Sequence, residues 1–337
     1  MTEIVILDSL GEMLYGFCNC DWIIMANSRW NNIEEKDITW MGTFNRILSE
    51  STLPELSGST LYVTSDYSGY DSKSKYFVIS ILVADLDNSV RWECFRRSVR
   101  STFMADGRRM SFKKLNDVNR LKALVPFLEA SDEIEGLCLS IGIRKEIKNF
   151  YIDKKVFESV QNKGVLKGNW SAKSLENMFR IVHFISIVIA GLAKPNQNIY
   201  WISDEDEILA NPMRSSDVAR LISAFTSMYV KHNLGELGVG TTRLDEGDRL
   251  EEDFAAVADL AAGAISEMLT KVGNTNPSFS FYEHEEHEAH ELPDYLSKKT
   301  EVILAWLGDD CRRLKKSILL FEQAKKKMFG LMRLQLG

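Results

Sequence analysis

Two aspartates end apolar stretches that read as β-strands. Asp66 follows the β-branched and aromatic run 60–65 and precedes a turn at 67–69. Asp204 follows the apolar run 199–202 in the same way. In open α/β sheets, reactive groups collect beyond the carboxyl ends of the strands, so we expect both carboxylates to project into one crevice. The alternatives are that Asp66 only forms the turn and that the acidic loop after 203 only caps the next helix.

A third aspartate, Asp259, lies within a helix expected over 251–271. The apolar side chains of this stretch follow the helical period and form a core stripe: Phe254, Val257, Ala258, Ala261, Ile265, Met268 and Leu269. Asp259 lies off the centre of the stripe, and its helical neighbours are all small: Ala255, Ala256, Ala262 and Gly263. Small neighbours let another segment approach the helix closely, so that a short carboxylate can reach it. The alternative is an exposed edge of an alanine-rich helix.

Three carboxylates at one place are suited to hard divalent cations. Mg²⁺ and Mn²⁺ prefer oxygen ligands, and two ions about 3.5–4 Å apart can bind both the attacking and the leaving oxygen of a phosphodiester. Carboxylates held together repel one another, so without metal at least one should have a raised pKa. The sequence therefore suggests Mg²⁺ or Mn²⁺ in a two-metal site built from Asp66, Asp204 and Asp259.

The net charge of −7 hides a strong asymmetry along the chain. Residues 91–122 carry ten Lys and Arg against three acids, and residues 311–337 carry eight against one. Acids concentrate at 203–207, 244–253 and 283–291. This segregation is compatible with a face for a polyanion beside an acidic pocket, and ordinary solvated helix faces are the alternative.

One basic segment, 108–115, combines cations with an aromatic residue, Phe112. Its cations are Arg108, Arg109, Lys113 and Lys114. Cations bind a nucleic-acid backbone by releasing counterions, and aromatic rings stack on bases, although Phe112 is expected in the core. If the segment is extended, Lys113 and Lys114 point to opposite sides, so only one of them should face the site.

Composition indicates a soluble, cytoplasmic protein without a membrane segment. Hydrophobic residues are 45% and charged residues 26% of the 337 residues, which is ordinary for a globular chain. The five cysteines are odd in number and contain no C-x-x-C pair, which suits a reducing compartment. The N-terminal residues lack the features of a signal peptide, and the apolar run 181–193 is too short to span a bilayer and is expected to be a core helix.

The order of elements predicts an α/β fold with a mixed sheet flanked by helices. Strands are expected at 60–66, 76–85, 135–143, 198–204 and 237–242, the first two as an antiparallel hairpin. Helices are expected at 88–104, 117–129, 171–193, 214–231 and 251–271, the first with a basic outer face of Arg91, Arg96, Arg97 and Arg100. The alternation in the second half indicates parallel strands with crossover helices. We expect three parts: an N-terminal extension or cap (1–57), an α/β domain (58–275) and a C-terminal helical tail (276–337).

The motifs at these positions resemble an RNase H-like family of unknown function. Its members carry Asp-x-Ser-Gly after the first strand, a lysine-containing segment after the first helix, an Asp ending a later strand, and an Ala-Asp pair within a late helix. The matching stretches here, which span roughly residues 60–271, are Asp66-Tyr67-Ser68-Gly69, Phe112-Lys113-Lys114-Leu115, Ile202-Ser203-Asp204 and Ala258-Asp259. Two positions depart from the pattern: Tyr67 replaces a common Glu, and Ala256 replaces a common Gln.

The resemblance implies an RNase H-like, metal-dependent nuclease that acts on RNA or DNA. On that pattern Asp66, Asp204 and Asp259 would hold the metal, Lys113 or Lys114 would lie near the scissile phosphate, and Ser68, Arg108 and Arg109 would contact the substrate. Relatives belong to mobile-element or phage-defence loci, which implies anti-phage defence or a toxin effector, with a homo-oligomer or a defence-system protein as partner. Because of the two departures, the alternative is an inactive scaffold that binds nucleic acid or protein.

A histidine array suggests a separate, less favoured metal site. His284, His287 and His290 lie three residues apart in an acidic run, so adjacent pairs could share a transition metal, whereas a solvated acidic helix or loop is favoured. His183 lies in an apolar run and is expected to be a core histidine. The sequence has no P-loop, dinucleotide-binding or serine-hydrolase motif.

Overall fold

A computed structural model describes most of the chain after residue 52. The described residues are 53–147, 154–162, 164, 166–204, 207–230, 232–245, 247–275, 296–309, 312–323, 329–334 and 336. Residues 1–52 of the expected extension, the histidine array at 284–290, and Cys18, Cys20 and Cys311 lie outside them.

The described strands form one sheet of seven strands in the order β5-β4-β1-β2-β3-β6-β7. Their bounds are β1 Thr60–Ser68, β2 Tyr76–Asp85, β3 Gly136–Arg144, β4 Asn198–Ser203, β5 Leu237–Thr241, β6 Leu314–Gln323 and β7 Phe329–Leu334. β2 runs antiparallel to β1 and β3, whereas β4 pairs parallel with both β1 and β5. Within the order β3-β2-β1-β4-β5 only β2 is reversed, so the sheet is mixed, as the sequence predicted, and RNase H-like, as the resemblance implied.

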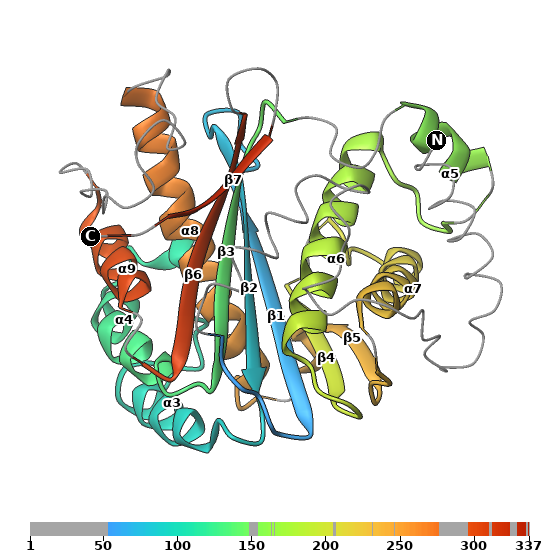
Figure 1. Cartoon of the computed structure of the whole chain (residues 1–337). Coiled ribbons are helices and arrows are strands. Elements are labelled where there is room, and N and C mark those ends of the chain that lie inside the picture. The colour runs from blue at the N-terminus through green and yellow to red at the C-terminus, as the bar shows by residue number, and fades with distance from the viewer. Residues whose placement is uncertain are drawn as a thin grey trace.

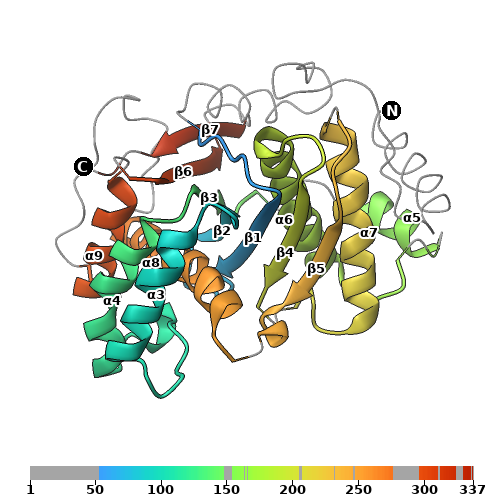
Figure 2. The same ribbon diagram turned by 90° about the horizontal axis from the view of Figure 1, so that it is seen from below.

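Helices cover both faces of this sheet (Figure 1). On one face lie α3 (Val90–Phe103), α4 (Val118–Ser131), α8 (Leu250–Thr275) and α9 (Lys298–Gly308). On the other lie α6 (Ala172–Leu192) and α7 (Pro212–Tyr229), with α5 (Lys154–Asn162) beside them. Figure 2 shows the sheet between these two layers. Strand residues alternate between the layers, which is why β2, whose residues before Asp85 are all apolar or small, is buried along its whole length.

Two short 3-10 helices complete the structure around the strand ends. One, η2 (Phe112–Lys114), lies in the connection from α3 to α4. The other, η3 (Thr242–Leu244), directly follows β5. Both fall in segments where the sequence shows no apolar period.

The hairpin, the parallel pairs and the helix order confirm the predicted α/β architecture, but the predicted helical tail is wrong after α9. β6 pairs parallel with β3 from Gly136 opposite Leu314 to Ile143 opposite Phe321, and β7 pairs with β6. The chain from 314 therefore extends the same sheet rather than forming a separate tail. Its apolar run 318–321 is buried on both faces of the sheet, and such a run has no period that separates a strand from a helix.

The predicted outer basic face of α3 is also wrong for two of its arginines. Arg96 is buried at 1% exposure and Arg100 is partly buried, and both donate to the buried carboxylate of Asp253 on α8. Arg91 and Arg97 are exposed as expected. A helical wheel places Arg96 on the polar side, but only the packing of α8 shows that a carboxylate faces it there.

The apolar helix α6 is longer than the run that the sequence singled out. Among the described residues it is the helix long and apolar enough to cross a membrane, yet 89% of its most apolar window is buried inside the molecule. His183 lies in its middle, contacts the Tyr229 hydroxyl at 3.1 Å, and has its pKa lowered to about 3 by burial. This confirms the prediction of a core helix with a core histidine.

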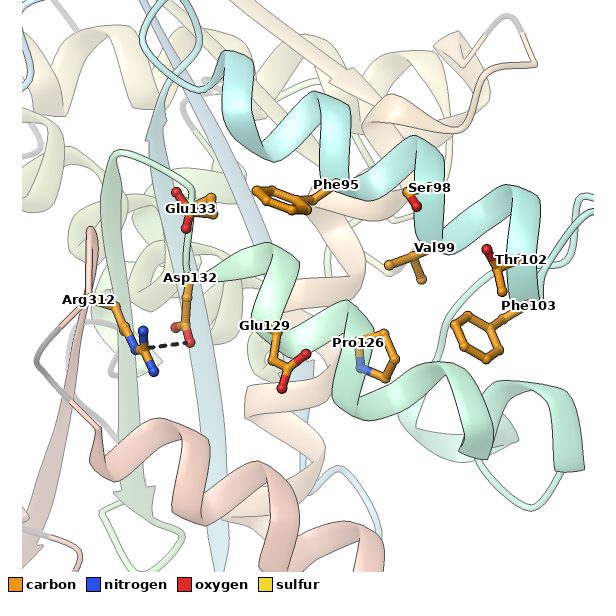
Figure 3. A pocket seen from close by; sticks show the side chains of 10 residues that line it. All are labelled: Phe95, Ser98, Val99, Thr102, Phe103, Pro126, Glu129, Asp132, Glu133 and Arg312. Carbon is orange, nitrogen blue, oxygen red and sulfur yellow. Dashed lines mark ion pairs between the residues drawn. The ribbon is translucent and has the colours of Figure 1, made fainter.

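On the outer side of α3 and α4, apolar side chains line a cavity of about 460 Å³ (Figure 3). Phe95, Val99 and Phe103 come from α3 and Pro126 from α4, while acidic residues and Arg312 lie at one end. No predicted site residue lines this cavity.

Candidate active site

Asp66 and Asp204 lie on neighbouring parallel strands at the same level. The last register pair of β1 and β4 is Ser65 opposite Ser203, and each aspartate comes one residue later. Paired strands lie about 4.8 Å apart, so the two backbones are adjacent at this point. Both side chains belong to the sheet face covered by α8, because Tyr62 and Ile202, at even spacing before them, pack in that layer. Asp204 accepts a hydrogen bond from the Thr242 hydroxyl at 3.2 Å.

The helix-capping alternative for the acidic loop is wrong. The helix that follows it, α7, begins at Pro212, and the Asn211 side chain caps it by accepting from the Arg214 N–H. Proline at the first position and asparagine before it form a complete start signal. Asp204 is thus available for another purpose at the end of β4.

Asp259 comes to the same place on α8. The Thr64 hydroxyl of β1 donates to the Phe254 carbonyl of α8 at 3.1 Å. Further along, the Thr270 hydroxyl of α8 bonds to Ser74, which lies beyond the end of β1, so α8 and β1 run in the same direction. From the Thr64–Phe254 contact, the helix rises about 7.5 Å over the five residues to Asp259, and the strand rises about 6.6 Å over the two residues to Asp66. The two aspartates therefore lie level with each other along the sheet.

The small face around Asp259 receives the segment 111–112, as the sequence suggested. The Phe112 N–H donates to the Asp259 carboxylate at 2.7 Å, and the Ser111 side chain also bonds to it. A side chain at Gly263 would place its Cβ 2.3 Å from Cγ of Phe112. Glycine is therefore required there for the ring to lie against the helix.

Asp259 has a raised pKa, as expected for one member of a carboxylate cluster. Burial is the main cause, and the negative charge of Asp204 adds to it. The Phe112 N–H, Ser111 and the charge of Lys113 act in the opposite direction. Asp204 and Lys113 are thus both close enough to Asp259 to change its charge state, which brings two of the predicted aspartates and one predicted lysine together.

The two lysines of η2 are both exposed. The charge of Lys113 acts on Asp259, whereas the expectation that only one of the pair faces the site stays a prediction. Ser68 lies two residues beyond Asp66 and therefore on the same face of β1.

The two arginines proposed as substrate contacts are engaged within the protein. Arg108 pairs with Asp106 and Asp117, and Asp117 also caps α4 by accepting from Asn119 and Arg120. Arg109 pairs with Glu252 of α8 and keeps a side chain that is 49% exposed. The Arg109 pair joins the connection between α3 and α4 to α8, and the Arg108 pairs lie within that connection, so a role of either arginine in substrate binding stays a prediction.

A second acidic cluster lies at the start of α8. Among the described residues, oxygens of Asp245, Asp248 and Glu251 lie within 4.8 Å of one another. Asp245 accepts backbone N–H groups of Gly247 and Arg249 at 2.9 Å, and Asp248 pairs with Arg96. These interactions are those of a helix N-terminus and of an ion pair between a buried guanidinium and an exposed carboxylate. Asp66, Asp204 and Asp259 do not form such a compact group of oxygens among the described residues.

Two contacts in the site had no signal in the sequence. Thr242 holds Asp204 from the end of β5, and Lys299 of α9 donates to the Phe112 carbonyl at 3.2 Å. The Lys299 ammonium also lies 4.5 Å from the centre of the Phe112 ring. A single threonine after a strand, or a lysine in an amphipathic helix, is too common a pattern to predict either contact.

The two departures from the family pattern differ in position. Tyr67 faces the α6 layer, where its hydroxyl bonds to Ser65 at 2.6 Å and its ring stacks on Phe77. A residue at 67 therefore cannot join the carboxylates on the other face. Ala256 is buried on the same side of α8 as Asp259, one turn earlier, so this departure does alter the surroundings of the site.

No protein-family model and no curated protein matches the sequence. Among solved structures, the chain is similar to the ribonuclease H2 from Pyrococcus horikoshii OT3, at 14% sequence identity and a TM-score of 0.34. The alignment covers 74% of this chain and 86% of that chain. The RNase H-like description of the sheet therefore rests on its strand order and directions.

Proposed function

We propose that this protein is a metal-dependent nuclease that hydrolyses phosphodiester bonds of RNA or DNA. The observation that carries the proposal is the buried carboxylate of Asp259, whose pKa is raised by burial and, less strongly, by the charge of Asp204 at the end of β4. A buried carboxylate beside another destabilises the fold unless a cation compensates it. Such a set of hard oxygen donors fits Mg²⁺ or Mn²⁺.

The residues divide the work as follows. Asp66, Asp204 and Asp259 would hold the divalent ions, whose chemistry there would be to activate a water and to stabilise the leaving 3′-oxygen. Thr242 fixes the Asp204 carboxylate, and the 111–112 backbone fixes that of Asp259. Lys113 is exposed beside Asp259, where its ammonium can neutralise charge on the scissile phosphate.

The test is cleavage of labelled RNA and DNA with Mn²⁺, for the parent and for the variants Asp204→Asn and Asp259→Asn. Each variant should lose more than about 100-fold in rate, since even residues that only support metal ligands contribute about 10- to 100-fold. If either variant cleaves at the parental rate, the proposed nuclease site is wrong.

A matched control separates the two acidic clusters. Asp248 is 54% exposed and belongs to the cluster at the start of α8. Asp248→Asn should keep Mn²⁺-dependent cleavage within a few-fold of the parent. If Asp248→Asn abolishes activity while Asp204→Asn does not, the metal lies at the other cluster.

A catalytically inactive scaffold on the same fold is the second candidate, and Ala256 is the observation that favours it. Calorimetric titration with Mn²⁺ discriminates the two. A nuclease should bind Mn²⁺ in a manner that Asp204→Asn removes, whereas a scaffold should show no binding that depends on these carboxylates.

A further inference from the structure

A second cavity, of about 570 Å³, opens on the α6 side of the sheet, the face opposite the proposed active site, at the turn that follows β1. Its lining includes Gly69, Tyr70, Phe77, Lys145, Lys173 and Arg180. Gly69 is the last residue of the Asp-Tyr-Ser-Gly stretch, so the cavity begins where that stretch ends. Four residues separate Asp66 from Tyr70, which limits the distance between their Cα atoms to about 14 Å.

The turn at Gly69 directs the chain into this cavity. Gly69 has a φ of +86°, and a Cβ there would lie 2.1 Å from the Tyr76 carbonyl oxygen. Only glycine adopts this conformation at such a close approach. The turn thus places Tyr70 against Phe77, with the ring centres 5.1 Å apart and the planes at 65°.

Tyr70 presents a large ring surface to solvent in the cavity. The residue is 41% exposed, while most aromatic residues of this part of the structure are buried. An exposed aromatic ring that is held in place by a second ring is a stacking platform for a base.

The charges of the cavity divide into a neutral floor and a basic mouth. On the floor, buried Arg180 pairs with buried Glu176 at 2.6 Å and also donates to the Ile147 carbonyl. At the mouth, the Lys145 ammonium donates to the Asp71 carbonyl, and exposed Lys173 is close enough to act on Lys145 electrostatically.

The one carboxylate at the mouth is already engaged. The Asp71 side chain accepts the N–H groups of Lys73 and Ser74 at 2.9 and 3.0 Å, as in a turn. Burial lowers the pKa of Lys145, the charge of Asp71 opposes this, and the charge of Lys173 adds a smaller lowering effect. Lys145 and Lys173 both line the cavity, so two cations are present there for an anion.

We propose that this cavity binds one nucleotide of a single-stranded nucleic acid, with its base on the Tyr70 ring and its phosphate between Lys145 and Lys173. The inference rests on the proposed nuclease function and deepens it, because it specifies that the substrate contains an unpaired nucleotide. A base inside a duplex is stacked and paired, and its face cannot reach an aromatic platform.

The experiment is equilibrium binding of a fluorescent 12-nucleotide oligo(dT) or oligo(U) to the full chain in EDTA, followed by anisotropy. Tyr70→Ala should weaken binding by between about 5-fold and 150-fold, the range for loss of one stacked base. Tyr70→Phe retains the ring and should bind within twofold of the parent. Lys145→Ala combined with Lys173→Ala should lower the slope of log K against log salt by about 0.7, one phosphate contact.

Matched controls come from the opposite layer. Phe95 is an exposed aromatic residue of the α3–α4 cavity, at 47% exposure, and Lys122 is an exposed lysine of α4. Phe95→Ala and Lys122→Ala should each bind the oligonucleotide within twofold of the parent. Melting curves of all variants show whether each one is folded.

The outcomes separate this inference from the proposed function. If Tyr70→Ala and the double lysine variant bind as tightly as the parent, or if the parent binds no single strand, the subsite is refuted whether or not the protein cleaves. If binding depends on Tyr70 and both lysines but no nucleic acid is cleaved with Mn²⁺, the nuclease proposal fails and the subsite stands.

Discussion

The contact between Gly263 and Phe112 is the smallest feature on which the proposed site depends. It lets the 111–112 backbone reach Asp259 and so brings Lys113 beside the carboxylates. Glycine in a helix interior normally costs about 1 kcal/mol relative to alanine. Its presence in α8 is therefore explained by the close approach rather than by the helix.

Replacing a helical glycine by alanine usually stabilises a protein, whereas replacing Gly263 should destabilise this one. Gly263→Ala puts a Cβ 2.3 Å from Cγ of Phe112, so we expect a loss of about 1–3 kcal/mol in the free energy of unfolding and a lower rate of cleavage. Gly273→Ala is the matched control, because its Cβ meets only the flexible Lys75 side chain at 3.0 Å. Urea unfolding of both variants checks the prediction, and equal effects at the two glycines would contradict it. Phe112→Ala should relieve the defect of Gly263→Ala.

The raised pKa of Asp259 predicts how stability depends on pH without metal. Below the unfolded value of 3.8, Asp259 is protonated in both states and its contribution to stability is complete. As pH rises through the folded pKa, the folded state must ionise a buried group and that stability is lost. Asp259→Asn keeps an acceptor for the Phe112 N–H but cannot ionise.

In EDTA, Asp259→Asn should therefore have a higher urea midpoint than the parent at pH 7, with a difference that shrinks toward pH 4. Saturating Mn²⁺ should reverse the order, since a ligand at 100 times its Kd stabilises the parent by about 2.7 kcal/mol. An asparagine variant that is no more stable than the parent at pH 7 in EDTA argues against a strained carboxylate.

At the scale of elements, a buried ion network joins α3 to the first turns of α8. Asp253 is fully buried and accepts from Arg96 at 3.1 Å and from Arg100 at 2.5 Å, and Arg96 also donates to the Asp248 carbonyl. Because α8 carries Asp259 two turns later, this network sets the position of the catalytic candidate along the sheet. Its charges cannot be removed singly without leaving others buried and unpaired.

Asp253→Ala should consequently cost about 3–5 kcal/mol in the free energy of unfolding, because two largely buried guanidinium groups lose their carboxylate. Arg97→Ala is a control from the same helix: Arg97 is 69% exposed and pairs only with Glu93 among the described residues, so its loss should cost less than about 1 kcal/mol. Urea denaturation compares the two. A similar small cost for both variants would show that the network does not support α8.

At the scale of the whole molecule, the last described strands complete the sheet that holds the site. β6 lies along the edge of β3 and buries Leu319, Leu320 and Phe321 between the two helical layers. Without β6, β3 would become an open edge with exposed backbone groups and an uncovered core.

The effect of a C-terminal truncation on folding should therefore depend on whether β6 is removed. A chain ending at residue 308 loses β6 and should fail to fold cooperatively, as measured by circular dichroism and thermal melting. A chain ending at residue 328 loses only β7, keeps β3 paired, and should fold with reduced stability. If the shorter chain melts like the full chain, the sheet is complete at β3 and the C-terminal strands are an accessory.

The elements around the site could be predicted because their signals are local. Apolar runs, turn residues and the helical period predicted β1, β2, β4 and α8 to within a few residues, and placed Asp66 and Asp204 at strand ends. The small neighbours of Asp259 likewise predicted a close contact on that side of the helix. Thr242, Ser111 and Lys299 could not be found in this way, because each acts through a partner that is distant in the sequence.

The sequence alone thus determined which segments are strands and helices and where carboxylates leave them, since periodicity and turn chemistry depend on near neighbours. Only the tertiary structure decided which arginines of α3 are buried and that the chain after α9 joins the sheet. Those outcomes depend on strand pairing and on which charged groups face one another across layers. Such contacts form between residues more than a hundred positions apart, and no local pattern records them.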